Sequence, residues 1–100
     1  MYQATTPTFV LTLPNDVDLT QAETVMFSFR QGFFALDKSG DDLTVVDQNT
    51  VSVYLSQSET VGLRNGIAQI QLNWTYSDGS RACTNIANVS INPNLYKAVI

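Results

Sequence analysis

Apolar and polar residues alternate without a break along the stretch QIQLNWTY, which covers residues 69–76. This period of two is typical of a β-strand with one buried face and one solvated face. Six other runs are also predicted as strands, and short segments rich in Gly, Pro, Asn, Asp and Ser separate them. The seven predicted strands cover residues 8–13, 23–31, 33–39, 43–46, 50–55, 67–76 and 81–91.

The apolar side of each alternation is the predicted core face. Four apolar residues follow one another at 33–36, where we expect Phe34 and Leu36 inside and the pattern does not decide the side of Phe33. Short strands joined by polar turns predict an all-β fold, an antiparallel immunoglobulin-like β-sandwich of about seven strands. The other residues predicted to face inward are Phe9, Leu11, Leu13, Val25, Phe27, Phe29, Val51, Val53, Leu55, Ala68, Ile70, Leu72, Trp74, Val89 and Ile91.

The strand period is interrupted after residue 55. Ser56-Gln57-Ser58-Glu59 has the spacing of a capping box, in which the hydroxyl and the carboxylate each accept a backbone N–H at the start of a helix. Glycines at 62 and 66 soon end the element. We therefore predict one short helical turn near residues 57–63, packed over an open end of the sheets.

The strand that contains Trp74 runs into a hairpin turn signal at 77–80. Asp78-Gly79 predicts a two-residue type I′ loop, which makes the numbers of facing residues sum to 157. In this register Trp74 faces Cys83, and Ala68 faces Val89. A slip of one residue would turn the apolar residues of the last strand towards water.

The same register leaves one misfit in the last strand. It places Asn85 inside the sandwich and Ile86 outside. Either Asn85 hydrogen-bonds to the backbone, or a β-bulge near these two residues changes the phase of the strand.

The chain is expected to form one β-sandwich domain at residues 1–92 and a C-terminal tail at 93–100. Residues 1–7 are interpreted as a loose arm or the start of an edge strand. The tail is too apolar to be only a solvated terminus. It is expected to pack back on the sandwich or to dock on a neighbouring subunit.

Charge is sparse in this chain. Five basic and nine acidic residues give a net charge of −4, and charged residues make up 14% of the sequence. The basic residues are scattered singly, so no cluster could neutralise several phosphates. We therefore expect no nucleic-acid partner and no binding to an anionic membrane surface.

The sequence contains no histidine, which excludes Ser-His-Asp and Cys-His catalytic groups and His-based metal sites. Cys83 is the single cysteine, so the chain has no internal disulfide bond, and we interpret it as a buried, unreactive thiol. Asp16 with Asp18, and Asp41 with Asp42, are interpreted as turn residues, although either pair could hold a hard cation with the help of carbonyl groups. We expect no enzymatic activity and no cofactor.

Two sets of outward residues are candidates for an interaction surface. The aromatic residues could stack on a sugar or contact a subunit if they lie on one side, although scattered exposed aromatics are more common. The polar row beside Trp74 could hydrogen-bond a glycan. The aromatic set is Phe33, Tyr54 and Tyr96, and the polar row is Gln69, Gln71 and Asn73.

The N-terminus lacks the basic and apolar regions of a signal peptide, and no apolar run approaches 18 residues. We therefore expect synthesis and folding in a cytoplasm, without a signal peptide and without a membrane span.

Several stretches between residue 4 and about residue 91 carry a resemblance to a protein family. The chain is similar to small phage and prophage proteins of Gram-positive bacteria, and to the immunoglobulin-like N-terminal domain of phage baseplate upper proteins. The stretches are ATTPTF (4–9), VDLT (17–20), VMFSFRQ (25–31), NTVSV (49–53), LSQSET (55–60) and NVSI (88–91).

This resemblance implies a non-enzymatic structural protein of a tail or baseplate. Its implied partners are other phage structural proteins or further copies of itself, and its implied location is the virion, after synthesis in the bacterial host cytoplasm. The alternative is a glycan- or cell-surface-binding β-sandwich module. The two hypotheses differ in the surface that matters, which is the apolar tail in the first and the polar row in the second.

Overall fold

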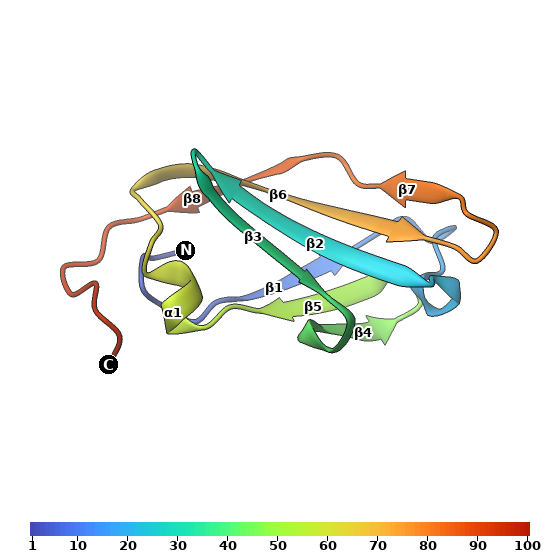
Figure 1. Cartoon of the computed structure of the whole chain (residues 1–100), viewed down its shortest axis with the longest axis horizontal. Coiled ribbons are helices and arrows are strands. Elements are labelled where there is room, and N and C mark those ends of the chain that lie inside the picture. Colours follow the sequence, from blue (N-terminus) through green and yellow to red (C-terminus); the bar gives the residue numbers. More distant parts are fainter.

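The computed structural model describes all 100 residues and shows two antiparallel sheets packed face to face (Figure 1). The smaller sheet has the strand order β1-β5-β4. The larger sheet has the order β3-β2-β6-β7, and β8 also pairs with β6. The elements are β1 (Thr8–Thr12), η1 (Leu19–Gln21), β2 (Thr24–Gln31), β3 (Phe34–Ser39), η2 (Gly40–Asp42), β4 (Leu43–Asp47), β5 (Thr50–Tyr54), α1 (Gln57–Thr60), β6 (Gly66–Thr75), β7 (Arg81–Cys83) and β8 (Ala87–Ile91).

The strand orders confirm the predicted immunoglobulin-like sandwich. In that fold strands B, E and D lie in one sheet and C, F and G in the other, with C′ added beside C in variable-type domains. The order β1-β5-β4 corresponds to B-E-D, and β3-β2-β6-β7 corresponds to C′-C-F-G. There are eight strands instead of about seven, because the predicted strand at 81–91 is divided into β7 and β8.

The core lies between the sheets and is built mainly from the predicted inward residues. Three further leucines outside that predicted set are also buried in it, namely Leu19, Leu43 and Leu63. Phe27, Phe29 and Leu72 of the larger sheet are fully buried. Phe9 of β1 reaches across from the smaller sheet, with ring centroids 6.0 Å from Phe27 and 6.1 Å from Phe29. These distances lie within the range of favourable aromatic pairs. Trp74 is also buried, and it packs in the same cluster near the end of β6.

The turn between β2 and β3 decides the side of Phe33. Gln31 pairs with Phe34, so Gly32 and Phe33 form a two-residue loop. Gly32 has a φ of +56°, as the first position of a type II′ turn requires, and Phe33 does not take a positive φ. Phe33 therefore points into solvent at the turn, while Phe34 and Leu36 face the core as predicted.

The predicted loop of the β6 hairpin is wrong by one residue. Thr75 pairs with Arg81, and Tyr76 donates its N–H to the carbonyl of Ser80, so the loop has three residues and the facing numbers sum to one less than predicted. A type I′ loop requires a positive φ at both of its central residues. Here Gly79 has a positive φ and Asp78 does not. The Asp78 carboxylate accepts the Ser80 N–H at 2.8 Å, which favours this turn over type I′.

This shift also corrects the prediction for Cys83. Cys83 pairs with Asn73 instead of Trp74, and Trp74 faces Ala82. Since neighbouring residues of a strand point to opposite faces, Cys83 joins the outward face of the sheet. The thiol is exposed and not buried.

A bulge between β7 and β8 restores the predicted register. Ile70 pairs with Ala87 and Ala68 with Val89, as expected from the hairpin argument. The change of phase falls at residues 84–86, where the Thr84 hydroxyl accepts the N–H of Leu72 at 3.1 Å. The bulge that the sequence offered as one of two explanations is therefore present.

The predicted capping box is confirmed at the start of α1. Ser56 Oγ accepts the N–H of Glu59 at 3.3 Å, and Glu59 Oε1 accepts the N–H of Ser56 at 2.8 Å. The helix is shorter than the predicted 57–63, because it ends at Thr60 and a turn continues to the buried Leu63. None of the helical elements has the length and apolar character needed to cross a bilayer.

We predict that Phe27→Ala lowers the free energy of unfolding by about 3–5 kcal/mol, because it removes a fully buried ring that Phe9 contacts. Phe33→Ala is the matched control and should change stability by less than about 0.5 kcal/mol, since that ring is fully exposed. Urea denaturation followed by Trp74 fluorescence measures both. Equal losses in the two variants would contradict the placement of the core.

Candidate functional site

The outward face of the larger sheet brings the predicted polar row together with residues of β2. Arg30 pairs with Gln69, Ser28 with Gln71, and Met26 with Asn73. Paired residues of neighbouring strands lie on the same face. The row therefore forms one side of a polar surface, and β2 forms the other.

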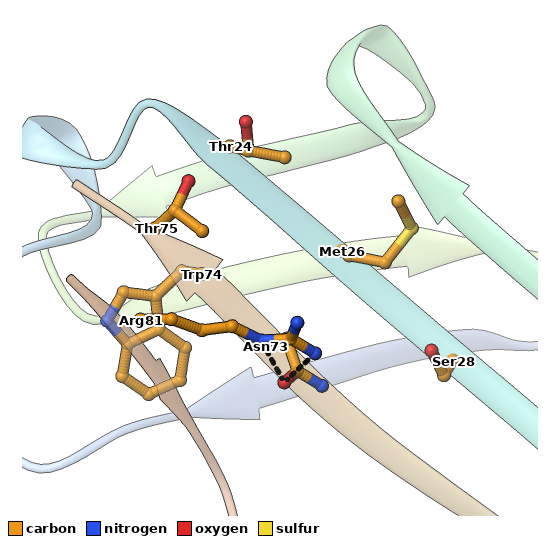
Figure 2. A pocket seen from close by; sticks show the side chains of 7 residues that line it. All are labelled: Thr24, Met26, Ser28, Asn73, Trp74, Thr75 and Arg81. Atoms are coloured by element: carbon orange, nitrogen blue, oxygen red, sulfur yellow. Dashed lines mark hydrogen bonds between the residues drawn. The ribbon is translucent and has the colours of Figure 1, made fainter. Parts of the chain in front are cut away.

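The members of the row differ in how far the chain itself uses them. Gln71 donates to the carbonyl of Thr84 at 2.9 Å, and thereby ties the bulge to β6. Asn73 Oδ1 accepts two hydrogen bonds from Arg81, at 3.2 and 3.0 Å, which Figure 2 shows. Gln69 is exposed and makes no side-chain hydrogen bond within the chain. Gln69 is therefore the residue of the row whose amide donor and acceptor are both free.

Two arginines give this surface its electrostatic character. Arg30 forms an ion pair with Asp37 of β3 at 2.9 Å. The hydrogen bond from Ser28, followed by the contacts with Arg30, lowers the pKa of Asp37. Arg81 has no carboxylate partner. Its guanidinium donates instead to the amide oxygen of Asn73. The surface therefore carries one compensated and one uncompensated positive charge.

Two adjoining depressions follow this surface, with volumes of about 220 and 280 Å³. We call them together the sheet groove. They share Ser28, Asn73 and Arg81, and Figure 2 shows the first of them between β2 and β6. Its hydroxyl, amide and guanidinium groups suit a polar or anionic ligand. The structure has no group of three or more Cys, Asp and Glu side chains that could hold a metal ion.

Arg81 and Ser28 line the sheet groove, but the sequence did not predict either as a site residue. The position of Arg81 opposite Thr75 depends on the hairpin register, which the sequence predicts wrongly by one residue. Ser28 alternates with the buried Phe27 and Phe29 and so lies on the outward face, and only the pairing of β2 with β6 brings it beside Gln71. The pairing of strands distant in sequence is the missing signal.

A second candidate surface is formed by the C-terminal tail. The tail packs back on its own chain, since Asn94 hydrogen-bonds Gln3 at 3.1 and 2.9 Å. Gln57 of α1 accepts the N–H of Ile100 at 2.9 Å and donates to its carbonyl at 3.1 Å. Figure 1 shows the tail beside α1 and the N-terminus, at one end of the elongated molecule.

Backbone and amide contacts hold the tail, but its large apolar side chains face solvent. We call this set the terminal apolar surface. Leu95 and Ile100 are 106% and 87% exposed. Tyr96 and Ile100 line the same open depression of about 340 Å³ with residues of the N-terminal arm. The set comprises Leu95, Tyr96, Val99 and Ile100.

The three aromatic candidates for an interaction surface are all exposed, at more than half of their surface. Phe33 lies in the β2–β3 turn, Tyr54 ends β5, and Tyr96 lies in the tail. These three parts of the chain lie at the same end of the molecule (Figure 1). No ring contact joins the three residues, so each is a separate feature of that end.

An ion pair fixes α1 against the larger sheet at this end. Lys38 Nζ lies 2.8 Å from Glu59 Oε1 and also donates to the carbonyl of Tyr54 at 2.8 Å. One lysine of β3 therefore contacts both the helix and the last residue of β5. Partial burial acts to raise the pKa of Glu59, but hydrogen bonds from Lys38 and Ser56 outweigh it, so the pKa is lowered.

Comparison with known proteins gives no match to a family model, a curated sequence or a solved structure.

We predict that Glu59→Gln lowers stability by about 1 kcal/mol at neutral pH, because glutamine keeps the capping box but leaves Lys38 without its ion partner. A carboxylate whose pKa is lowered by folding stabilises above its unfolded pKa, and this contribution is lost as the pH falls through the folded pKa. The difference between wild type and variant should therefore shrink on acidification through the ordinary Glu range and vanish below it.

Chemical denaturation at a series of pH values tests this prediction. Glu23→Gln is the control, because Glu23 is exposed and forms no ion pair, and it should track the wild type at every pH. A Glu59→Gln deficit that stays constant down to the lowest pH would contradict the role of the carboxylate.

Proposed function

We propose that this protein is a non-enzymatic structural component of a phage or prophage particle, a β-sandwich building block of a tail or baseplate. The observation that carries the proposal is the terminal apolar surface. A tail anchored to its own domain by polar contacts, with Leu95 and Ile100 outward, is suited to insertion into a neighbouring protein. Large apolar groups exposed together commonly mark protein–protein contacts.

The remaining support comes from the chemistry of the chain and its resemblance. The sequence has no histidine, and two of the acidic side chains near turns bind the backbone there: Asp18 accepts the N–H of Thr20, and Asp47 accepts that of Asn49. The sequence stretches that resemble baseplate proteins supply the setting. Other structural proteins of the particle, or further copies of the chain, are the proposed partners, and the virion is the proposed location.

We expect the protein to be found in virions purified from the phage or lysogen that encodes it, by mass spectrometry. Leu95→Asp should reduce its incorporation by about tenfold or more, since burying a leucine is worth roughly 1.5–3 kcal/mol. Leu95 is fully exposed, so the variant should fold normally. Val46→Asp, which changes an exposed residue of β4, is the matched control and should be incorporated normally.

Absence of the wild-type protein from purified virions would overturn the proposal. Equal incorporation of both aspartate variants would remove the terminal apolar surface as the contact.

The sheet groove favours a second candidate function, a glycan- or cell-surface-binding module. It gathers hydroxyl, amide and guanidinium groups along one face, and both the Gln69 amide and the Arg81 charge lack a full set of partners within the chain. Hydrogen bonds from such groups are the usual means of recognising sugar hydroxyls and carboxylates. The proposed ligand is a polar or acidic glycan.

A glycan array and host wall preparations test this second candidate. Binding should be lost in Gln69→Ala, which leaves the folded structure intact because the Gln69 side chain has no partner there. Val46→Ala, at an exposed site of β4 on the smaller sheet, is the control that should keep binding. Failure to bind any glycan or wall preparation would exclude the function.

A further inference from the structure

The β1 strand has an open edge that no other part of the chain covers. It lies at the end of the smaller sheet and pairs only with β5. Pro7 accepts the N–H of Leu55, and Leu13 donates to Asn49, so the odd-numbered residues direct their backbone groups towards β5. In an antiparallel pair the intervening residues direct theirs to the opposite side. Thr8, Val10 and Thr12 therefore present free N–H and C=O groups to solvent.

The other edges of the two sheets carry the features that normally prevent strand addition. The β3 edge bears Asp37 and Lys38, and the β4 edge lies between Asp42 and Asp47 with an irregular register near its end. The edge formed by β7 and β8 is interrupted by the bulge, and the N-terminal arm runs beside its end. Charges, bulges and covering segments are the known protections of edge strands.

The β1 strand has none of these protections. Its five residues, Thr-Phe-Val-Leu-Thr, contain no charge, no proline and no bulge. The acidic residue closest to β1 in the sequence is Asp16, although the chain as a whole carries a net negative charge. The strand is also nearly the same when it is read in either direction, with Val10 at its centre.

We propose that a second copy of this chain adds to β1 in antiparallel fashion, about a two-fold axis at Val10. Thr8 then faces Thr12 of the second copy, and Val10 faces Val10. The free N–H and C=O groups of these three positions form about six backbone hydrogen bonds across the axis. The two smaller sheets become one continuous six-stranded sheet with an isologous interface.

The side chains fit the same arrangement. Phe9 and Leu11 point inward and are only partly buried in the single chain. In the dimer Phe9 faces Leu11 of the second copy at a non-hydrogen-bonded position, where side chains across two strands approach most closely. The apolar layer then continues from one copy into the other.

Two features of the sequence limit the register in which two β1 strands can pair. A slip of one residue would bring inward residues opposite outward ones and break the apolar layer. A shift of two residues towards the C-terminal end would place Pro14, which has no N–H, opposite Thr8. The symmetric pairing keeps every donor. It would hold in solution whether or not the protein is part of a virion.

Sedimentation velocity over about 10 µM to 1 mM tests the dimer, since a short strand interface is expected to be weak. Val10→Lys should weaken dimerisation by about tenfold or more, because it places two like charges opposite each other on the axis. Val10 is 65% exposed, so the variant should fold. Val10→Thr keeps the β-branched shape and should still dimerise. Val46→Lys, at a similarly exposed site on β4, should dimerise like the wild type.

Amide hydrogen exchange identifies the surface directly. The amides of Thr8, Val10 and Thr12 should exchange freely at low concentration and become protected as the dimer forms. A wild-type protein that stays monomeric over the whole range would overturn the inference. So would a dimer that survives Val10→Lys, or one in which these amides stay unprotected. Leu95→Asp should dimerise normally, which separates this inference from the role proposed for the terminal apolar surface.

Discussion

The packing of Phe9 against Phe27 and Phe29 is the contact on which the two-sheet structure depends. Phe9 belongs to the smaller sheet and the other two rings to the larger one. With a single cysteine, no disulfide bond joins the sheets, so their attachment rests mainly on side-chain burial. Phe34 extends the layer by an edge-on contact with Phe29, at a centroid distance of 6.0 Å. In every strand, the apolar residues of the alternating pattern therefore have to face this one layer between the sheets.

That dependence explains why the sequence predicts most of the fold. A strand with one buried face must alternate, and the alternation identifies the inward side without knowledge of its partners. It places Phe27 and Leu72 correctly, and it locates the strands to within a few residues. The capping box at Ser56 is likewise a local signal, because its two hydrogen bonds join residues only three positions apart.

The errors fall where a local choice between similar turns sets the register of a long pairing. Asp78-Gly79 is compatible with a two-residue or a three-residue loop, and the hydrogen bond from Ser80 to the Asp78 carboxylate favours the longer one. One residue of difference moves Cys83 to the outer face. For the same reason the sheet groove is only partly predictable. The Gln69 side is visible as alternation, while the position of Arg81 requires the correct register.

The distribution of hydrogen bonds explains which parts of the molecule remain available for other molecules. The chain has few charges, and its amide side chains largely serve its own backbone: buried Gln31 bonds both backbone groups of Arg64, and Asn49 bonds the carbonyl of Leu13. No buried side-chain nitrogen or oxygen lacks a partner. The groups available to other molecules therefore lie at the surface, and they include the free backbone of the β1 edge, the exposed apolar side chains of the tail and a few members of the sheet groove. Backbone pairing and apolar burial involve no ionic charge, so contacts through the first two would be screened little by salt. Contacts through Arg81 would be weakened by it, because an exposed charge is screened within about 10 Å at ordinary ionic strength.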